Sequence, residues 1–469
     1  MRKYPFNAVL LYVADQGRPD WNVSDLMPYV LHDFSDDTPK SWMFDSFILM
    51  DLYFYQNEVS KALWNDKNVP RGTDINYHFA TKDDWQGLIN RYLSVAGYLN
   101  TAITTAISEA GGNPPFKHKF YVGLPEPLTT YCVNGGYIHF TNREDAPVWG
   151  HLPDSNNECE EIRFTWNGPR NEDANESCSR ALIWFINTFI SRLGNNCTNF
   201  PNLEFGGFYW IGENTFGWTI AFDTIIKVRQ HIQYLNNNDN NDLQLLYAPY
   251  KGYYQKLWTT NGNYIPYRDQ CSYTPDGETT PVHPFDVVCA QPGLFQIESC
   301  PEHREESCTI DCTDHSKHCP VAALRFMNDV VRVYGDGLVF EVDAENIRQF
   351  MPARQYISFF EKWPMMPAIY YLDEQLLIHI YSTENNCPLL QHCVLKEYID
   401  ELATLINNRR ERQLLPEDVN GNGIVDIIDQ NIVQNEMMSP DENVGLSDVN
   451  GDGKVDIKDY VQVSNKIGH

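Results

Sequence analysis

The sequence has little positive charge: 35 Lys and Arg stand against 63 Asp and Glu, and the formal net charge at pH 7 is −28. Nucleic acids and anionic membrane surfaces would be repelled by this balance. No run of about 18 or more apolar residues is present, so no membrane-spanning helix is expected. Both absences favour an acidic, soluble protein.

Several catalytic motifs are also missing. The sequence has no G-x-S-x-G elbow, no P-loop and no H-E-x-x-H helix, and its histidines suggest no triad. Serine hydrolases, nucleotide-binding enzymes and metalloproteases are therefore disfavoured. The length of 469 residues suits one large domain with a small module, or two to three domains.

The start of the chain has only a superficial likeness to a signal peptide. Met1-Arg2-Lys3 precedes an apolar segment at 6–14, but Asp15-Gln16-Gly17 stands where a small-residue cleavage site belongs. We expect the apolar segment to be the first strand of the mature fold.

Five of the 12 cysteines cluster in one segment: Cys289, Cys300, Cys308, Cys312 and Cys319. The even total and the cluster favour disulfides, and with them an oxidising, extracellular setting. Zinc is the alternative, because His303, His315 and His318 lie in the same segment. No Cys-x2-Cys pair supports it. We therefore expect a disulfide-stapled loop in a secreted protein.

A duplicated motif near the C-terminus is the most specific signal. From Asp418 the chain reads D-V-N-G-N-G-I-V-D-I-I-D, and from Asp448 it reads D-V-N-G-D-G-K-V-D-I-K-D. In both copies oxygen-bearing side chains recur at positions 1, 3, 5, 9 and 12, with Gly at position 6, which is the pattern of a calcium loop. An amphipathic helix is predicted after each loop, over 427–437 and 457–467.

Two loop-and-helix units of this kind closely resemble the dockerin family. The resemblance implies two calcium ions and a cohesin domain as partner. The side-chain ligands that it implies are Asp418, Asn420, Asn422, Asp426 and Asp429 in the first loop and Asp448, Asn450, Asp452, Asp456 and Asp459 in the second, completed by the carbonyls of Ile424 and Lys454. We place this all-α module at 413–469, after a large domain at 1–412.

The large domain reads as strands alternating with helices, which predicts a parallel sheet. Eight apolar, β-branched or aromatic runs lie at 6–14, 42–54, 119–125, 205–211, 243–248, 285–290, 337–342 and 367–372. The clearest helices are predicted at 82–110, 174–193, 218–235, 321–334 and 347–362. The expected fold is an α/β (β/α)8 barrel, TIM-like, with long loop insertions.

Catalytic residues of such a barrel lie where its strands end. Glu213 follows the fourth run, and Glu341 and Asp343 fall in or after the seventh. Two carboxylates on opposite sides of a barrel mouth suit an acid/base and a nucleophile that flank a glycosidic bond. We favour Glu341 over Asp343 as nucleophile because it lies within the strand.

This placement resembles the superfamily of retaining barrel glycosidases, although Gly212 stands where that superfamily favours Asn. Residues 6–380 more nearly resemble an uncharacterised family of bacterial barrel proteins suspected to be glycosidases, through Trp42-Met-Phe-Asp45-Ser-Phe, Trp85, Gly207-Phe-Tyr-Trp and Phe340-Glu341. Predicted contacts to the sugar are Asp45, Glu126, Tyr209, Trp210, Tyr250, Gln291 and Asp343. Asp45 is equally open to a structural role as a buried hydrogen-bond acceptor.

Two functional classes remain. The first is a secreted glycoside hydrolase that acts on a polysaccharide or glycan and is tethered through its dockerin to a cohesin-bearing scaffold. The second is a catalytically silent carbohydrate-binding or scaffold component on the same barrel.

Overall fold

The computed structural model describes most of the barrel and much of the C-terminal module. The described residues are 6–13, 21–33, 40–51, 53–56, 59–62, 80–127, 130–133, 136–139, 144, 146, 148–154, 156–164, 172–194, 200–211, 222–239, 241–249, 284–292, 327, 330–331, 336–342, 357–372, 389–419, 425–438, 447–450 and 454–467.

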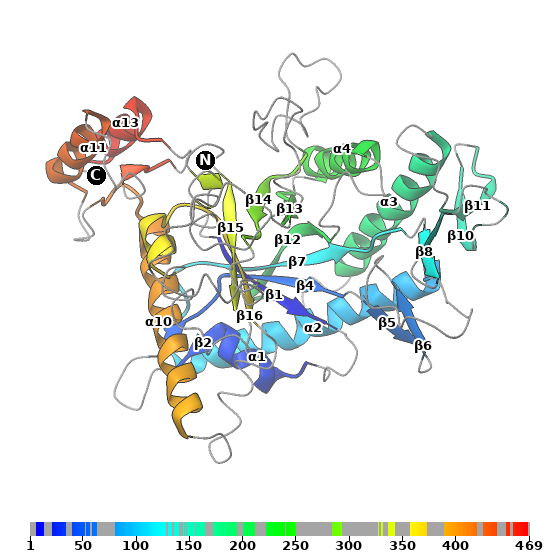
Figure 1. The fold of residues 1–469 in the computed structure, drawn as a ribbon, viewed down its shortest axis with the longest axis horizontal. Helices are drawn as coiled ribbons and strands as arrows, with labels where there is room; N and C mark the ends of the chain where they lie inside the picture. The colour runs from blue at the N-terminus through cyan, green and yellow to red at the C-terminus, as the bar shows by residue number, and fades with distance from the viewer. Residues whose placement is uncertain are drawn as a thin grey trace.

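Eight parallel strands close into a barrel and follow one another around it in chain order (Figure 1). They are β1 (Asn7–Tyr12), β4 (Ser46–Met50), β7 (His118–Leu124), β12 (Leu203–Trp210), β13 (Gln244–Tyr247), β14 (Val287–Ala290), β15 (Gly337–Val342) and β16 (Ala368–Leu372). Each predicted run contributes one strand to the barrel, and β16 pairs with β1 to close the ring. The predicted (β/α)8 barrel is confirmed.

Three predicted helices are confirmed: α2 (Lys82–Glu109), α3 (Glu172–Gly194) and α4 (Phe222–Asp239). The predicted helices at 321–334 and 347–362 lie mostly outside the described residues. Two helices were not predicted, α1 (Val23–Val30) and α10 (Leu389–Leu414). No helix in the described ranges is long and apolar enough to cross a membrane.

Small antiparallel hairpins form insertions between the barrel elements. They are β2–β3 (Leu31–His32, Ser41–Trp42), β5–β6 (Tyr53–Gln56, Val59–Ala62), β8–β9 (Thr130–Val133, Gly136–His139) and β10–β11 (Val148–Pro153, Cys159–Arg163). Trp149 of β10 packs edge-on against Trp85 of α2, with ring centroids 4.9 Å apart. This contact anchors the β10–β11 hairpin to the helical layer.

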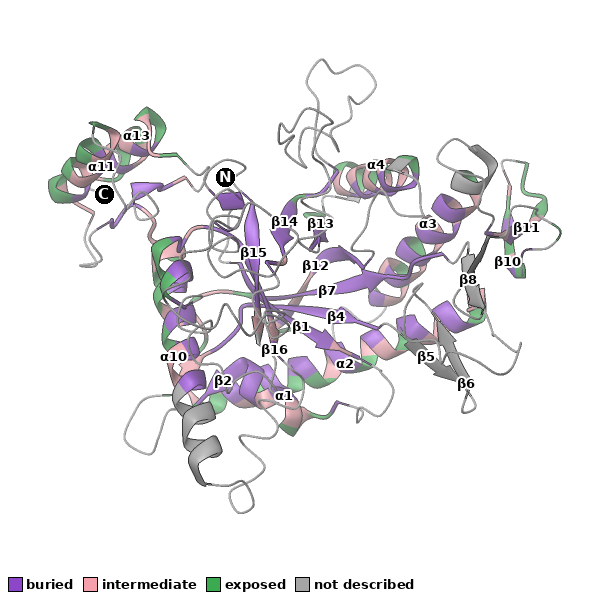
Figure 2. Ribbon diagram, in the orientation of Figure 1, coloured by how far each residue is buried: buried purple, intermediate pink, exposed green. Residues whose placement is uncertain are grey.

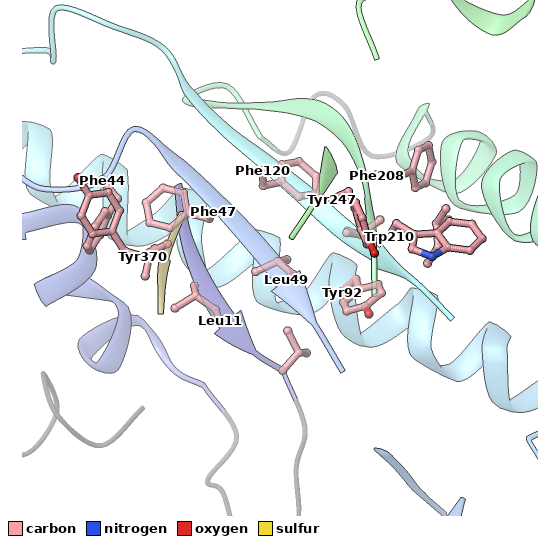
Figure 3. Close-up of a cluster of buried hydrophobic side chains, with 14 of the residues drawn as sticks. Leu11, Phe44, Phe47, Leu49, Tyr92, Phe120, Phe208, Trp210, Tyr247 and Tyr370 are labelled. Carbon is pink, nitrogen blue, oxygen red and sulfur yellow. The ribbon is translucent and has the colours of Figure 1, made fainter. Parts of the chain in front are cut away.

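The barrel strands are buried on both faces, as the purple strands of Figure 2 show. Alternate residues turn to opposite faces, and two separate apolar clusters result. The interior cluster fills the barrel with side chains such as Leu10, Ile48 and Ile369. The larger cluster lies between the strands and the helices; Figure 3 shows part of it, including Phe120 and Tyr92.

Helix α10 closes the N-terminal end of the barrel through two buried arginines. Arg409 donates from Nη1 to the carbonyls of Phe360 (2.9 Å) and Trp363 (2.8 Å), and from Nη2 to the carbonyl of Met366 (2.7 Å). Arg410 donates to the carbonyl of Trp42 at 3.0 Å. The backbone carbonyls below the strands are thus satisfied by side chains of a helix distant in sequence.

The C-terminal module continues directly from α10 (Figure 1). Its helices α11 (Ile427–Met438) and α13 (Ile457–Lys466) confirm the two predicted helices. A small apolar cluster holds them together, made of Val419, Val433, Val449 and Val463. The predicted boundary between residues 412 and 413 falls in the last turn of α10, and Arg412 donates to the backbone carbonyl of Asp418 at the start of the first loop.

Candidate functional site

Glu341 faces the barrel interior near the C-terminal end of β15. Val339, two residues earlier, belongs to the interior cluster, and alternate residues of a strand share a face. The parallel register sets Glu341 beside Tyr371 of β16, whose ring packs against the same cluster. Two observations therefore agree that this carboxylate points inward, at the end where catalytic residues of such barrels lie.

The inward-facing side chains at this end differ in exposure around the ring. Met50, Ile211 and Ala248 are buried. Four others are partly exposed and stand on or just after the consecutive strands β14, β15, β16 and β1: Gln291, Glu341, Tyr371 and Tyr12. We call these four residues the open side of the barrel mouth, because solvent reaches the interior face there.

Gln291 is held in place by its neighbours. Its Nε2 donates to the carbonyl of Ala248 at 2.8 Å, and its backbone N–H donates to the carbonyl of Pro249 at 2.9 Å. Both acceptors lie just beyond β13. The amide is therefore fixed on the inward face just after β14, the strand next to β15, where a polar substrate contact can be made.

Three predicted site residues, Glu213, Tyr250 and Asp343, lie outside the described residues. The roles predicted for these three residues stay predictions.

Tyr209 and Trp210 occupy opposite faces of β12. Tyr209 is buried in the interior cluster below the mouth. Trp210 is buried in the outer cluster, where its ring meets Phe285 edge-on at 6.4 Å (Figure 3 labels Trp210). Both placements favour core packing over contact with a sugar.

Glu126 lies just beyond β7 and is buried. Burial and the nearby charge of Glu126 together raise the pKa of the Cys178 thiol on α3 to about 12. The role of Glu126 as a sugar contact stays a prediction.

Asp45 lies at the opposite end of the barrel, immediately before β4. Its carboxylate accepts from the backbone N–H of Asn7 (2.9 Å), the Asn7 amide (2.9 Å) and the hydroxyl of Ser46 (3.0 Å). Burial raises the pKa of this carboxyl, and the charge of Arg410 opposes that rise. The placement favours the structural alternative for Asp45.

Of the five clustered cysteines, only Cys289 is described. It lies within β14, buried in the interior cluster. The other four are outside the described residues, so the disulfide and zinc interpretations stay predictions for the segment that follows β14.

Tyr12 and Tyr371 belong to the open side but were not predicted as site residues. Tyr371 stands next to Tyr370 in β16, and Tyr370 faces the outer cluster. An Ile-Tyr-Tyr-Leu run does not reveal which tyrosine turns inward. The signal that would have found them is alternation from Ile369 and Leu10, two residues before each.

The two loops of the C-terminal module have matching geometry. The position-12 carboxylates, Asp429 and Asp459, are fully buried. Each accepts the backbone N–H of its own position 9, from Asp426 and Asp456, at 2.9 Å. Asp459 also accepts the backbone N–H of Asn450 at 3.0 Å. The predicted ligands Asn420, Asn422, Ile424 and Asp452 lie outside the described residues.

Two family models match separate parts of the chain. Residues 416–468 match the dockerin type I domain. Residues 7–262, more than half of the chain, match a domain of unknown function, DUF4855. The chain belongs to the DUF4855 family. No curated protein matches it.

The DUF4855 match covers the first five barrel strands. Glu213 lies inside the matched residues, whereas Gln291, Glu341 and Tyr371 lie beyond them. The family assignment thus establishes kinship for the first part of the barrel, and the open side of the mouth is seen mainly in the structure.

The dockerin module has the chemistry that calcium requires. Type I dockerins bind calcium. Here Asp418 and Asp448, the first residues of the loops, are buried together with the two position-12 carboxylates. The module's three lysines, at 454, 458 and 466, are all exposed. Buried carboxylates with no buried lysine or arginine of their own module fit a hard divalent cation as the neutralising charge.

Proposed function

We propose that the barrel is a retaining glycoside hydrolase, with Glu341 as the nucleophile and Glu213 as the general acid/base. The observation that supports it is the placement of Glu341, an inward-facing and partly exposed carboxylate at the C-terminal end of barrel strand seven. A fixed carboxylate that solvent can reach is what attack on an anomeric carbon requires.

The geometry of the barrel agrees with a two-carboxylate mechanism. Strands β12 and β15 lie three places apart in the eight-stranded ring, so inward side chains at their ends approach across the mouth. A retaining mechanism needs a carboxyl separation of about 5–5.5 Å. Glu341 would form the glycosyl ester while Glu213 protonates the leaving oxygen, and Glu213 would then deprotonate the attacking water.

The dockerin defines where such an enzyme works. Dockerin domains bind cohesin domains. We propose that this one attaches the enzyme to a cohesin-bearing scaffold outside the cell, as in a cellulosome-type assembly. The substrate is then a polysaccharide or glycan, and Gln291, Tyr250 and Asp343 supply polar and aromatic contacts to it.

The test is turnover by the full chain with calcium present, on a panel of polysaccharides and aryl glycosides. We expect at least one member to be cleaved, with retention of anomeric configuration in the first product by proton NMR. Glu213→Gln should keep activity on aryl glycosides with good leaving groups, because these need no protonation. Glu341→Gln should lose activity on every substrate.

A catalytically silent carbohydrate-binding barrel would give different results in these assays. Saturable binding of a glycan without cleavage would identify a carbohydrate-binding barrel. A product of inverted anomeric configuration would support a glycoside hydrolase but reject Glu341 as a nucleophile. Inverting enzymes place a water between the carboxylate and the sugar.

A further inference from the structure

Tyr12 and Tyr371 form a fixed aromatic pair on the open side of the mouth. They stand on the adjacent strands β1 and β16, and their ring centroids are 5.8 Å apart with an interplanar angle of 87°. Both rings pack against the interior cluster and remain partly exposed. An edge-to-face pair supported from below has few alternative positions, so its exposed surface is preorganised.

This pair adjoins the proposed nucleophile. Glu341 and Tyr371 are register partners across β15 and β16, and their side chains lie on the same inward face. A ligand at the Glu341 carboxylate therefore lies next to the Tyr371 ring. Gln291 follows β14, on the other side of β15, so an amide and two phenols stand on the strands that neighbour the one with Glu341.

The charge of the open side limits which ligands can bind there. The described inward-facing residues at this end include no lysine or arginine: they are Tyr12, Met50, Gly123, Ile211, Ala248, Gln291, Glu341 and Tyr371. The chain as a whole carries a formal charge of −28. An anionic ligand would meet Glu341 without a compensating cation from these residues. A neutral ligand with hydroxyl groups and an apolar ring face suits the phenols, the amide and the carboxylate.

We propose that Tyr12 and Tyr371 form the aromatic wall of a sugar-binding subsite beside Glu341, and that this subsite takes a neutral pyranose unit. The inference rests on the proposed function and adds to it a substrate class and two binding residues. The axial C–H face of the sugar packs on the tyrosine rings, and its hydroxyls meet Gln291 and the carboxylate.

The test measures binding separately from turnover. The protein is the full chain carrying Glu213→Gln, with calcium present, so that Glu341 keeps its charge and hexasaccharides, which have poor leaving groups, stay intact. Calorimetry would compare neutral hexasaccharides of glucose, xylose and mannose with hexasaccharides of galacturonate and mannuronate. Tyr12→Leu and Tyr371→Leu remove each ring but keep an apolar side chain. Tyr98→Leu changes an exposed tyrosine on α2 and is the matched control.

We expect at least one neutral hexasaccharide to bind, and each Leu variant at the wall to weaken it about five- to tenfold, as loss of one aromatic contact implies. Tyr98→Leu should leave the affinity unchanged. Tyr371→Phe should keep most of it, because it retains the ring. Near-UV circular dichroism and melting temperature confirm that each variant is folded.

Three results would overturn the inference. Equal affinity of wall variants and control would place the sugar elsewhere, even if turnover proves the enzyme. Preference for the uronate hexasaccharides would reject the neutral class. Absence of binding by every probe would reject the subsite, whereas failure of the proposed function shows separately, as absence of cleavage by the unmodified chain.

Discussion

The Nε of Arg409 donates to Oδ1 of Asn7 at 3.1 Å, and this bond ties the helix before the dockerin to the first strand of the barrel. Gln413 strengthens the tie, because its Oε1 accepts from the Asn7 amide at 3.0 Å and its Nε2 donates to the carbonyl of Pro364 at 2.8 Å. Arg409 and Gln413, at the end of α10, thus close the same end of the barrel at which β1 begins.

Replacement of Arg409 should be costly. Arg409→Leu leaves three backbone carbonyls and the Asn7 side chain without their buried donor, and we expect a loss of about 3–5 kcal/mol in the free energy of unfolding. Urea denaturation followed by tryptophan fluorescence measures it. Arg192→Leu, at the end of α3, is the control and should change stability by less than about 0.5 kcal/mol. A loss at Arg409 as small as the control's would contradict the role of α10 as the barrel floor.

His118 should make the barrel sensitive to acid. Its ring packs against Trp42, Phe47 and Phe116, and neither ring nitrogen has a hydrogen-bond partner among the residues that the structure describes. Burial, with a smaller effect from the charge of Arg410, lowers the pKa of His118 from 6.5 to about 3. Between those values the unfolded chain binds the proton and the folded chain does not, so stability falls as the pH falls.

The variant His118→Phe removes the imidazole that takes up a proton on unfolding. We expect its unfolding free energy to decline less steeply than the wild type's between pH 6.5 and pH 3, as measured by urea denaturation across that range. His151→Phe, at an exposed position on β10, should keep the wild-type slope. Identical slopes for all three proteins would show that folding does not lower the pKa of His118.

Gly207 should tolerate no side chain. Its φ is +133°, and a Cβ there would lie 2.1 Å from the carbonyl oxygen of Gln244. The pairing of β12 with β7 shifts register between Phe205 and Gly207, so the strand is bent at this point. We expect Gly207→Ala to destabilise the barrel by about 3 kcal/mol or more. Thermal melts of the variant measure this loss. Gly112→Ala, where no atom lies within 4 Å of the added Cβ, should leave the melting temperature nearly unchanged.

Calcium removal should unfold or loosen the dockerin. With calcium at about 100 times its dissociation constant, binding to the folded state alone adds about 2.7 kcal/mol of stability. Calorimetric melts of the full chain should show a dockerin transition that rises with calcium and falls with chelator. Asp429→Ala with Asp459→Ala should abolish the response, whereas Asp223→Ala on α4 should preserve it. If the temperature of the dockerin transition in the unmodified chain is the same with calcium and with chelator, the prediction of two bound calcium ions is wrong.

The barrel could be predicted from sequence because its strands are largely buried on both faces and most of their residues are apolar, as in Val-Leu-Leu-Tyr of β1. The dockerin could be predicted because the calcium ligands of each loop lie within twelve consecutive residues, so that their spacing is visible in the sequence. Helix α10 was missed although Tyr398, Ile399, Leu402 and Ile406 follow a helical period. Its decisive residues are buried arginines, and their partners are carbonyls that only the closed barrel brings together.

The site was less predictable because it depends on strand direction and on which face a side chain takes. Asp45 was expected near the mouth but precedes its strand, which puts it at the opposite end. Tyr209 and Trp210 were both predicted to contact the sugar, but neighbours in a strand face opposite ways. Tyr371 was missed for the same reason. Glu341 was found because it ends a strand, where one step of alternation from Val339 decides its direction.

The most direct test of the central claim is the turnover of Glu341→Gln on whichever glycan the unmodified chain cleaves, measured as new reducing ends with calcium present. Glu361→Gln, at an exposed position between β15 and β16, is the matched control. We expect kcat to fall about a thousandfold or more for Glu341→Gln, because the nucleophile is lost, and to stay at the wild-type value for Glu361→Gln. Full turnover by a folded Glu341→Gln variant would show that the carboxylate on the open side of the mouth is not the nucleophile.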